Sequence, residues 1–380
     1  MERKVYLDNA STTYVSNEVI HEMLPCFSAI YGNSNSLHCF GREASAIVDR
    51  SRDRIAKAIG SKSNEIYFTS GGTEANNWAI KGIAHAYKEK GNHIIVSKIE
   101  HESVLESCRQ LEKEGFKVTY LNVDSEGLVS IAELLHYITK RTLLVSVMAV
   151  NNEVGTIQNI KTIAQIAHEN GVLFHTDAVQ AIGSVKIDVN DVGIDLMTIS
   201  GHKIYGPKGV GALYVKKGIN LKQSVFGGGQ EFGLRSGTEN TCGIISFGVA
   251  AEIVVNNQKT NYEKVKQLKN MFLQELTTDF NVSLNSTENC SPYIISFAVK
   301  KVKAETILHM AEEQGVLISN GSACSSKHTD NRILKAMGIP AELIISSVRV
   351  SFSEFNTVDE VITAAKVIKE TCNRYIKILK

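Results

Sequence analysis

The chain has 380 residues, of which 43% are hydrophobic and 21% charged, and this globular composition excludes a disordered or collagen-like chain. Forty-one basic and forty acidic residues leave a net charge of +1, so no broad basic surface for direct binding of nucleic acid or anionic lipid is expected. The length predicts one large domain and a smaller one.

Several classes of protein are made improbable by what the sequence lacks. No apolar run approaches the roughly 18 residues that span a bilayer, and MERKVYLDNA at the N-terminus has no signal-peptide pattern. The seven cysteines are scattered without a CxxC pair, and the eleven histidines show no metal-ligand spacing. We therefore expect a cytoplasmic protein with free thiols, no metal site and no membrane segment.

From about residue 17 to residue 215, amphipathic helical patterns alternate with short apolar runs. Helices are predicted at 39–59, from about 73, from about 103, near 131–138 and near 161–169. Strands are predicted at 65–70, 93–97, 116–122, 142–150, 172–178, 195–200 and 211–215. This alternation predicts an α/β fold with a mostly parallel central sheet that is covered by helices on both faces.

The pattern changes after GGGQEFGLRSGT (227–238). A long helical stretch at roughly 239–278 leads to strands near 282–285 and 293–299, further helices, and a strand at 346–352. This part predicts a smaller α+β unit, with the boundary inside a helix near 255–260.

Five of the predicted strands end in segments rich in polar residues or glycine: SGGTE, KIEH, NNEVG, DAVQ and SGHK. Ligands of open parallel sheets bind outside the carboxyl ends of the strands. The sequence therefore predicts one crevice that is lined by five different loops.

Two of these segments have both a functional and a structural interpretation. SGGTEANN (70–77) suits an anion at a helix N-terminus, but Thr73 as a plain N-cap with Glu74 in the first turn explains it equally well. Asp177 follows a buried strand and needs a cationic or hydrogen-bonding partner, such as a pyridinium nitrogen. The alternative is that Asp177 caps the next turn.

Lysine and histidine candidates lie in two further segments. SGHKIYGPKGVG (200–211) contains Lys203 and Lys208, and a partly desolvated lysine can form an imine. Lys208 lies in a Pro-Lys-Gly turn, which favours a solvated side chain. His101 suits stacking on a flat ring and proton transfer, although a single histidine is more often structural.

The C-terminal part contributes a thiol and a guanidinium. Cys324 lies among glycine, serine and alanine in SNGSACSS (319–326), a composition typical of an accessible loop. Cys108, by contrast, lies in a predicted helix and is expected to pack as a small hydrophobe. Arg349 suits a carboxylate, and an ordinary surface ion pair is the alternative.

Taken together, the chain resembles pyridoxal-phosphate enzymes of the class V aminotransferase type, and among them the NifS/IscS-like cysteine desulfurases. The resemblance covers nearly the whole chain in family order: YLDNASTT, SGGTEANN, IEHES, NNEVG, HTDAVQ, SGHKIYGPKG, RSGT, SNGSAC and SSVRVSF. It implies fold type I of the pyridoxal-phosphate-dependent transferases. The large cofactor-binding domain would be 15–257, and residues 1–14 and 258–380 would form the small domain with the cysteine loop and the substrate arginine.

The resemblance also implies roles for individual residues. Lys203 would bind pyridoxal 5'-phosphate covalently, Cys324 would be the nucleophile, and His101 would stack on the ring and assist proton transfer. Asp177 would pair with the pyridinium nitrogen, and Gln180 would contact the phenolic oxygen. The remaining implied ligands hold the phosphate (Gly72, Thr73, Ser200, His202 and, from the other subunit of a homodimer, Thr238) or position the substrate (Asn152, also near the cofactor, and Arg349).

The implied reaction converts L-cysteine to L-alanine, with the sulfur leaving as a persulfide on Cys324 for an acceptor protein. That acceptor would serve iron–sulfur cluster assembly or thiolation of tRNA or of a cofactor. A selenocysteine lyase and a catalytically idle partner of sulfur-transfer assemblies are the alternative functions.

This chain departs from the family pattern at three places. Ser34 stands where relatives commonly have proline, and Ser353-Glu354 stands where many have Gly-Arg. The sequence ends at Lys380, without the longer tail that housekeeping relatives use toward a scaffold partner. These departures spare the chemical residues and leave the identity of the sulfur acceptor open.

Overall fold

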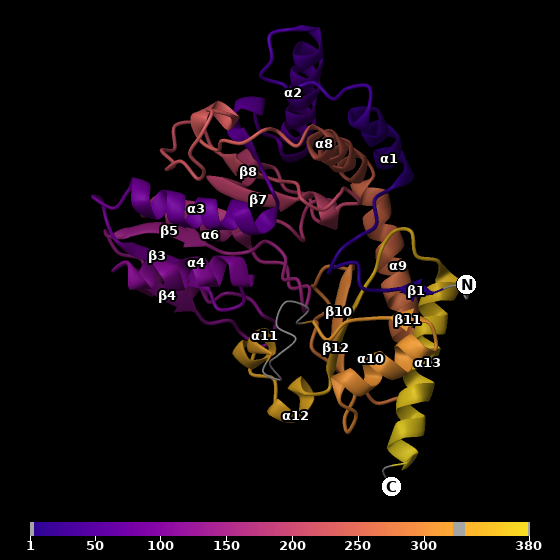
Figure 1. Cartoon of the computed structure of the whole chain (residues 1–380). Helices are drawn as coiled ribbons and strands as arrows, with labels where there is room; N and C mark the ends of the chain where they lie inside the picture. The colour runs from indigo at the N-terminus through magenta and orange to yellow at the C-terminus, as the bar shows by residue number, and fades with distance from the viewer. Residues whose placement is uncertain (1–3, 322–330, 379–380) are drawn as a thin grey trace.

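The computed structural model describes residues 4–321 and 331–378, and its largest element is a seven-stranded sheet (Figure 1). The strand order is β2 (Ile66–Thr69), β8 (Gly211–Val215), β7 (Leu196–Ser200), β6 (Leu173–Asp177), β5 (Thr142–Ser146), β3 (His93–Ser97) and β4 (Lys117–Leu121). Strand β8 is antiparallel to both of its neighbours, and the other pairs are parallel. The predicted α/β class with a mostly parallel sheet is confirmed.

Helices cover both faces of this sheet, because alternate residues of each strand point to opposite sides. Ile94 and Val96 of β3 pack in one core with α3 (Gly72–Ala86) and α4 (Glu102–Lys113). Ile95 belongs to the other core. That core also contains residues of α2 (Cys39–Ile59), α5 (Ile131–Tyr137), α6 (Ile160–Glu169), α7 (Val189–Val192), α8 (Thr241–Asn256) and α1 (Asn17–Met23).

A second, smaller unit has its own core, at the lower right of Figure 1. Its antiparallel sheet has the order β12 (Ser347–Ser351), β10 (Ile294–Ala298) and β9 (Ser283–Leu284). The N-terminal strand β1 (Val5–Tyr6) pairs in parallel with β11 (Val316–Leu317), so both ends of the chain lie in this unit. Helices α9 (Gln258–Thr277), α10 (Ala304–Glu313) and α13 (Val358–Ile378) contribute to its core. Helices α11 (Arg332–Ala336) and α12 (Ala341–Ile344) pack instead in a small separate cluster with Ile99 and Val154.

Two element boundaries differ from the sequence prediction. The helical stretch expected at 239–278 is two helices, because the backbone leaves the α-helical conformation at Asn257 (φ −98°, ψ 3°). Side chains of α8 up to Val254 enter the first core, and those of α9 from Val265 onward enter the second. The strand expected at 142–150 ends at Ser146, where its pairing with β3 also ends, opposite Val96.

A buried ion pair fixes the loop that follows β8. Arg52 of α2 forms two hydrogen bonds with the carboxylate of Glu231, at 2.7 and 3.0 Å, and also donates to the carbonyl of Ile66. Its guanidinium lies 4.6 Å from the ring centre of Phe68, whose backbone N–H donates to Glu231. The loop 227–238 is therefore held against the first core by a charge pair that water does not reach.

Replacing one partner of this pair is expected to destabilise the fold. Glu231→Ala leaves the Arg52 charge buried and unpaired, which should lower the free energy of unfolding by about 3–5 kcal/mol. Urea unfolding followed by circular dichroism measures the change. Asp191→Ala, which breaks the exposed pair with Lys161, is the control and should cost at most about 1 kcal/mol. Equal losses in the two variants would contradict a special role of the Arg52–Glu231 pair.

Candidate active site

A cavity of about 290 Å³ lies where the carboxyl ends of the large sheet's strands face the smaller unit. Ten of the twelve predicted site residues line it: Gly72, Thr73, His101, Asn152, Asp177, Gln180, Ser200, His202, Lys203 and Arg349. Thr238 is exposed and lies outside the lining of this cavity. Cys324 lies outside the described residues. The structure therefore brings together residues that are up to 277 positions apart, from Gly72 to Arg349.

Asp177 ends strand β6 and is 4% exposed. One carboxylate oxygen accepts from the backbone N–H of Val179 at 2.9 Å, and the other accepts from the side-chain amide of Asn76 at 2.7 Å. No cation pairs with this carboxylate in the described part of the chain. Asp177 therefore accepts a hydrogen bond from the turn that follows it, as the capping alternative requires. Its buried carboxylate also lines the cavity.

The N-terminus of α3 forms one end of the cavity. The helix begins at Gly72 with Gly71 as N-cap, so Thr73 is in the first turn and the interpretation of Thr73 as the cap was wrong. A Cβ atom on Gly72 would lie 2.9 Å from the side chain of Val179, so this close approach requires glycine. Because the first N–H groups of a helix have no partner within it, this end of the cavity suits an anion.

His202 and Lys203 also line the cavity, from the short helix η3 (Gly201–Lys203). Burial, with the nearby charges of Lys203 and Lys208, lowers the pKa of His202 to about 4, so its ring is neutral near pH 7. Lys203 donates from Nζ to the carbonyl oxygens of Ala10 and Ser11, the latter at 2.8 Å. Lys208 is exposed and outside the cavity lining, which distinguishes the two candidate lysines.

His101 and Gln180 line the cavity from two other loops. His101 is the N-cap of α4, and its Nδ1 accepts from the backbone N–H of Ser103 at 3.2 Å. A neutral ring then carries its proton on Nε2. The side-chain amide of Gln180 donates to the carbonyl of Ala10 at 2.9 Å.

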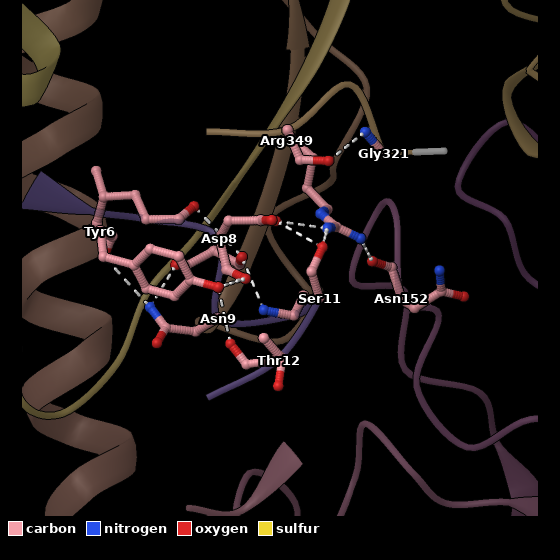
Figure 2. A network of polar contacts seen from close by, with 12 residues as sticks. Tyr6, Asp8, Asn9, Ser11, Thr12, Asn152, Gly321 and Arg349 are labelled. Carbon is pink, nitrogen blue, oxygen red and sulfur yellow. Dashed lines mark hydrogen bonds and ion pairs between the residues drawn. The ribbon is translucent and has the colours of Figure 1, made fainter. Parts of the chain in front are cut away.

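Arg349 of β12 also lines the cavity and is only 2% exposed (Figure 2). One terminal nitrogen donates to the carbonyl of Asn152 at 2.8 Å. The other donates to the carboxylate of Asp8 at 2.7 Å and to the hydroxyl of Ser11 at 2.6 Å. Arg349 is therefore buried and does not form the surface ion pair considered as the alternative. One of its two terminal nitrogens already binds the carboxylate of Asp8.

The cavity also contains polar atoms without partners. Eight buried side-chain nitrogen and oxygen atoms of the described residues lack a hydrogen bond, and five of them line this cavity: Asn76 Oδ1, Glu100 Oε2, Asn152 Oδ1, Ser200 Oγ and Arg349 Nε. Such atoms cost free energy unless a ligand or water pairs with them. Their concentration around an anion-binding helix end, a lysine and a buried carboxylate fits a group that carries a phosphate and a protonated ring nitrogen.

The sequence analysis missed Glu100 and Asn76, which both belong to this cavity. Glu100 has no exposed surface, and burial raises its pKa to about 8, with the charge of Asp177 acting in the same direction. Its Oε1 accepts from the hydroxyl of Ser97 at 2.6 Å and from the N–H of Met148 at 2.8 Å. Two features of the sequence could have pointed to these residues. Glu100 directly precedes His101, and Asn76 lies one helical turn after Gly72.

Two more residues that the sequence analysis did not select, Glu153 and Arg332, line the cavity. Glu153 is buried, which raises its pKa, and it accepts from the side chain of Asn331 at 2.6 Å. Arg332 donates to the carbonyl of Glu100 at 2.7 Å. In residues 4–321 and 331–378, no three histidine, cysteine or acidic side chains are grouped as metal ligands would be, and no helix is long and apolar enough to cross a bilayer.

Comparison with known proteins gives matches over nearly the full length. The aminotransferase class-V family matches residues 5–363. A protein of Clostridium botulinum named cysteine desulfurase IscS is 46% identical over 95% of this chain and 92% of its own. A solved NifS-like protein superposes with a TM-score of 0.93 at 35% identity, covering 98% of this chain and all of its own. The structure of SspA in complex with cysteine gives 0.83 at 35% identity, over 93% and 99% of the two chains.

The raised pKa of Glu100 predicts a pH-dependent effect of Glu100→Gln. An unfolded glutamate loses its proton near pH 4.3, whereas folded Glu100 keeps it to about pH 8. The wild-type free energy of unfolding therefore falls across this window as pH rises, while the variant lacks that loss. From pH 5.5 to pH 7.5 the variant should gain about 1–3 kcal/mol relative to wild type.

Urea unfolding of cofactor-free protein at the two pH values measures this difference. Glu65→Gln, a change at a buried acid far from the cavity, serves as the comparison. A Glu100→Gln difference that does not change with pH would show that the folded protein holds Glu100 ionised throughout.

Proposed function

The chain belongs to the class-V aminotransferase family and is a cysteine desulfurase, and we propose that its cavity converts L-cysteine to L-alanine while Cys324 carries the sulfur away. The observation that carries the proposal is the convergence of Lys203, Asp177 and Arg349 in one cavity with unpartnered polar atoms. The sulfur acceptor would be another protein, as in iron–sulfur cluster assembly or thiolation.

Pyridoxal phosphate is the cofactor that the family requires, and the residues present suit it. The α3 N-terminus with Thr73, Ser200 and His202 would hold its phosphate. Asp177 would meet the ring nitrogen, with Asn76 keeping the carboxylate in place. His101, Gln180 and Asn152 would contact the ring, and Lys203 would hold the cofactor covalently. When bound, this cofactor stabilises negative charge on the α-carbon of an amino acid.

The chain's own groups then have separate tasks. Arg349 would bind the substrate carboxylate, with Asn152 beside it. Lys203, once released by the incoming amine, would take the α-proton on Nζ. The Cys324 thiolate would attack the substrate sulfur, so that an S–S bond forms and the C–S bond breaks. The electron pair of that bond stays with the substrate carbons, so that the β-carbon takes up a proton, the α-carbon regains one from Lys203, and alanine leaves.

The position of Cys324 in the chain supports its role as nucleophile. Gly321 and Arg332, the described residues near either side of it, both line the cavity. Cys324 is three residues beyond Gly321, and three residues reach at most about 11 Å. A chain of that length would allow the thiol to reach the substrate, and a transaminase or dehydratase would not need such a thiol.

We also propose a homodimer of two-domain subunits in the cytoplasm. Exposed apolar side chains occur within residues 24–40 (Leu24, Phe27, Tyr31, Leu37 and Phe40) and at Phe226 and Phe232, in the segment before the exposed Thr238. Exposed apolar surface of this kind is typical of protein interfaces. The division into 15–257 and 1–14 with 258–380 agrees with the helix break at Asn257 and the two cores. Six described cysteines are free thiols, which agrees with a reducing compartment.

Lys203→Ala should abolish covalent attachment of the cofactor. After borohydride reduction, mass spectrometry should find pyridoxal phosphate on the peptide with Lys203 in the wild type and on no peptide of the variant. Alanine formation should fall by at least about 100-fold, since the variant also lacks the proton-transferring amine. Lys208→Ala, at an exposed lysine, is the matched control and should keep both properties. Attachment and turnover that survive in Lys203→Ala would refute the assignment.

Cys324→Ser should separate substrate binding from sulfur transfer. Adding cysteine should still change the visible absorption of the bound cofactor, whereas sulfide and alanine release should be lost. Labelling of persulfides should detect Cys324 in the wild type, and Cys39→Ser, at an exposed cysteine, should leave the label unchanged. Undiminished alanine release from cysteine in Cys324→Ser would remove Cys324 from the mechanism. A wild type that uses selenocysteine alone would favour a selenocysteine lyase.

A further inference from the structure

Tyr205, two residues after Lys203, has a backbone conformation that needs outside support. Its φ of 64° lies in the left-handed region, which bulky side chains rarely adopt. The turn folds tightly there, because the backbone N–H groups of Ile204 and Gly206 both donate to the carbonyl of Gly201. The placement of the Lys203 amine therefore depends on what holds Tyr205.

The backbone of Tyr205 is held by the segment before α1. Its N–H donates to the hydroxyl of Thr13 at 2.8 Å, and its carbonyl accepts from the N–H of Ser16 at 3.1 Å. Thr13 also binds the carbonyl of His202 through both its N–H and its hydroxyl. These contacts fix one side of the turn that carries Lys203.

The side chain of Tyr205 is held by the smaller unit. Its hydroxyl lies 2.9 Å from the hydroxyl of Ser353 and donates to the carboxylate of Glu354. The other oxygen of Glu354 accepts from the side-chain amide of Asn261 on α9 at 3.0 Å. Burial raises the pKa of Tyr205 well above its ordinary value, so the phenol remains a donor.

Packing and hydrogen bonds act together on Tyr205. Its side chain is 7% exposed, belongs to the first core, and has T-shaped ring contacts with Tyr14 and Phe355. Tyr205 and Glu354 also both line a small cavity of about 50 Å³ beside Lys203 and Gln180 and a larger one of about 490 Å³ beside Asn261. The hydroxyl contacts therefore lie where space is left around the two side chains and add to the packing that orients Tyr205.

Glu354 lies five residues after Arg349 on the segment that leaves β12. The same stretch of chain therefore provides a guanidinium in the active-site cavity and a carboxylate that binds the turn carrying Lys203. This joins the position of the smaller unit to the position of Lys203.

We propose that Glu354 is a positioning residue for Lys203, which acts by holding Tyr205 and thereby the left-handed turn that carries the lysine. The proposal rests on the proposed function only for the role of Lys203 in binding pyridoxal phosphate. It predicts that the Tyr205–Glu354 contact governs how readily the Lys203 amine reaches the cofactor.

The test compares Glu354→Ala, Glu354→Gln and Tyr205→Phe in the full chain. The first readout is the rate at which added pyridoxal phosphate becomes attached to cofactor-free protein, followed by visible absorption. Glu354→Ala and Tyr205→Phe should slow attachment about tenfold and lower kcat by a similar factor, with KM for cysteine within about twofold, because misplacing a reacting group by about 1 Å can cost up to about 100-fold.

The remaining variants separate positioning from simple stability. Glu354→Gln keeps an oxygen that accepts from Tyr205 and should stay within about threefold of wild type. The double variant Glu354→Ala with Tyr205→Phe should be no slower than either single variant, because one contact is removed twice. Glu65→Ala is the matched control, because it removes a buried carboxylate that accepts from the backbone N–H groups of Lys62 and Lys217 and does not line the cavity. It should lower the melting temperature without slowing attachment.

Wild-type attachment rates in Glu354→Ala and Tyr205→Phe, even with lowered melting temperatures, would overturn the proposal, and so would additive slowing in the double variant. If Glu354→Ala does not fold, Glu354→Gln and Tyr205→Phe still decide, and a Tyr205→Phe protein with an unchanged attachment rate overturns it. Wild-type protein that attaches the cofactor yet forms no alanine from cysteine would refute the proposed function alone, since the attachment rates remain measurable.

Discussion

The active-site cavity depends on the buried guanidinium of Arg349, which contacts three residues from two separate parts of the chain. It binds Asp8 and Ser11 from the N-terminal segment and the carbonyl of Asn152 from the loop after β5 (Figure 2). A charge with only 2% exposure needs such partners, which both terminal nitrogens have, so these contacts hold the two cores around one cavity. A substrate carboxylate that reaches Arg349 must share the fork with Asp8 or displace it.

Both basic and acidic groups line the cavity. Lys203 and Arg349 lie close together, because the first donates to the carbonyl of Ser11 and the second to its hydroxyl. Asp177 and Glu100 line the cavity as well, and burial favours a neutral Glu100, so the two acids do not both add charge near pH 7.

Much of the fold could be predicted from the sequence because its signals are local. The helix at Cys39–Ile59 and the strand at His93–Ser97 appear where the periodicity placed them. The break at Asn257 was not visible, because both α8 and α9 continue a helical pattern and only the change of core separates them. Glu100 and Asn76 were missed for a related reason: an acid and an amide gain meaning only when burial leaves Glu100 without water and aims Asn76 at Asp177.

The sequence alone determined the chemistry that this protein can perform, because Lys203, Asp177, Cys324 and Arg349 are reactive or charged groups whose properties follow from their side chains. Tertiary structure decided which lysine faces the cavity, which acid keeps its proton, and that Arg349 is already engaged by Asp8. These outcomes depend on distance and burial between residues far apart in the chain. Neither the distance nor the burial can be deduced from the residues that are neighbours in the sequence.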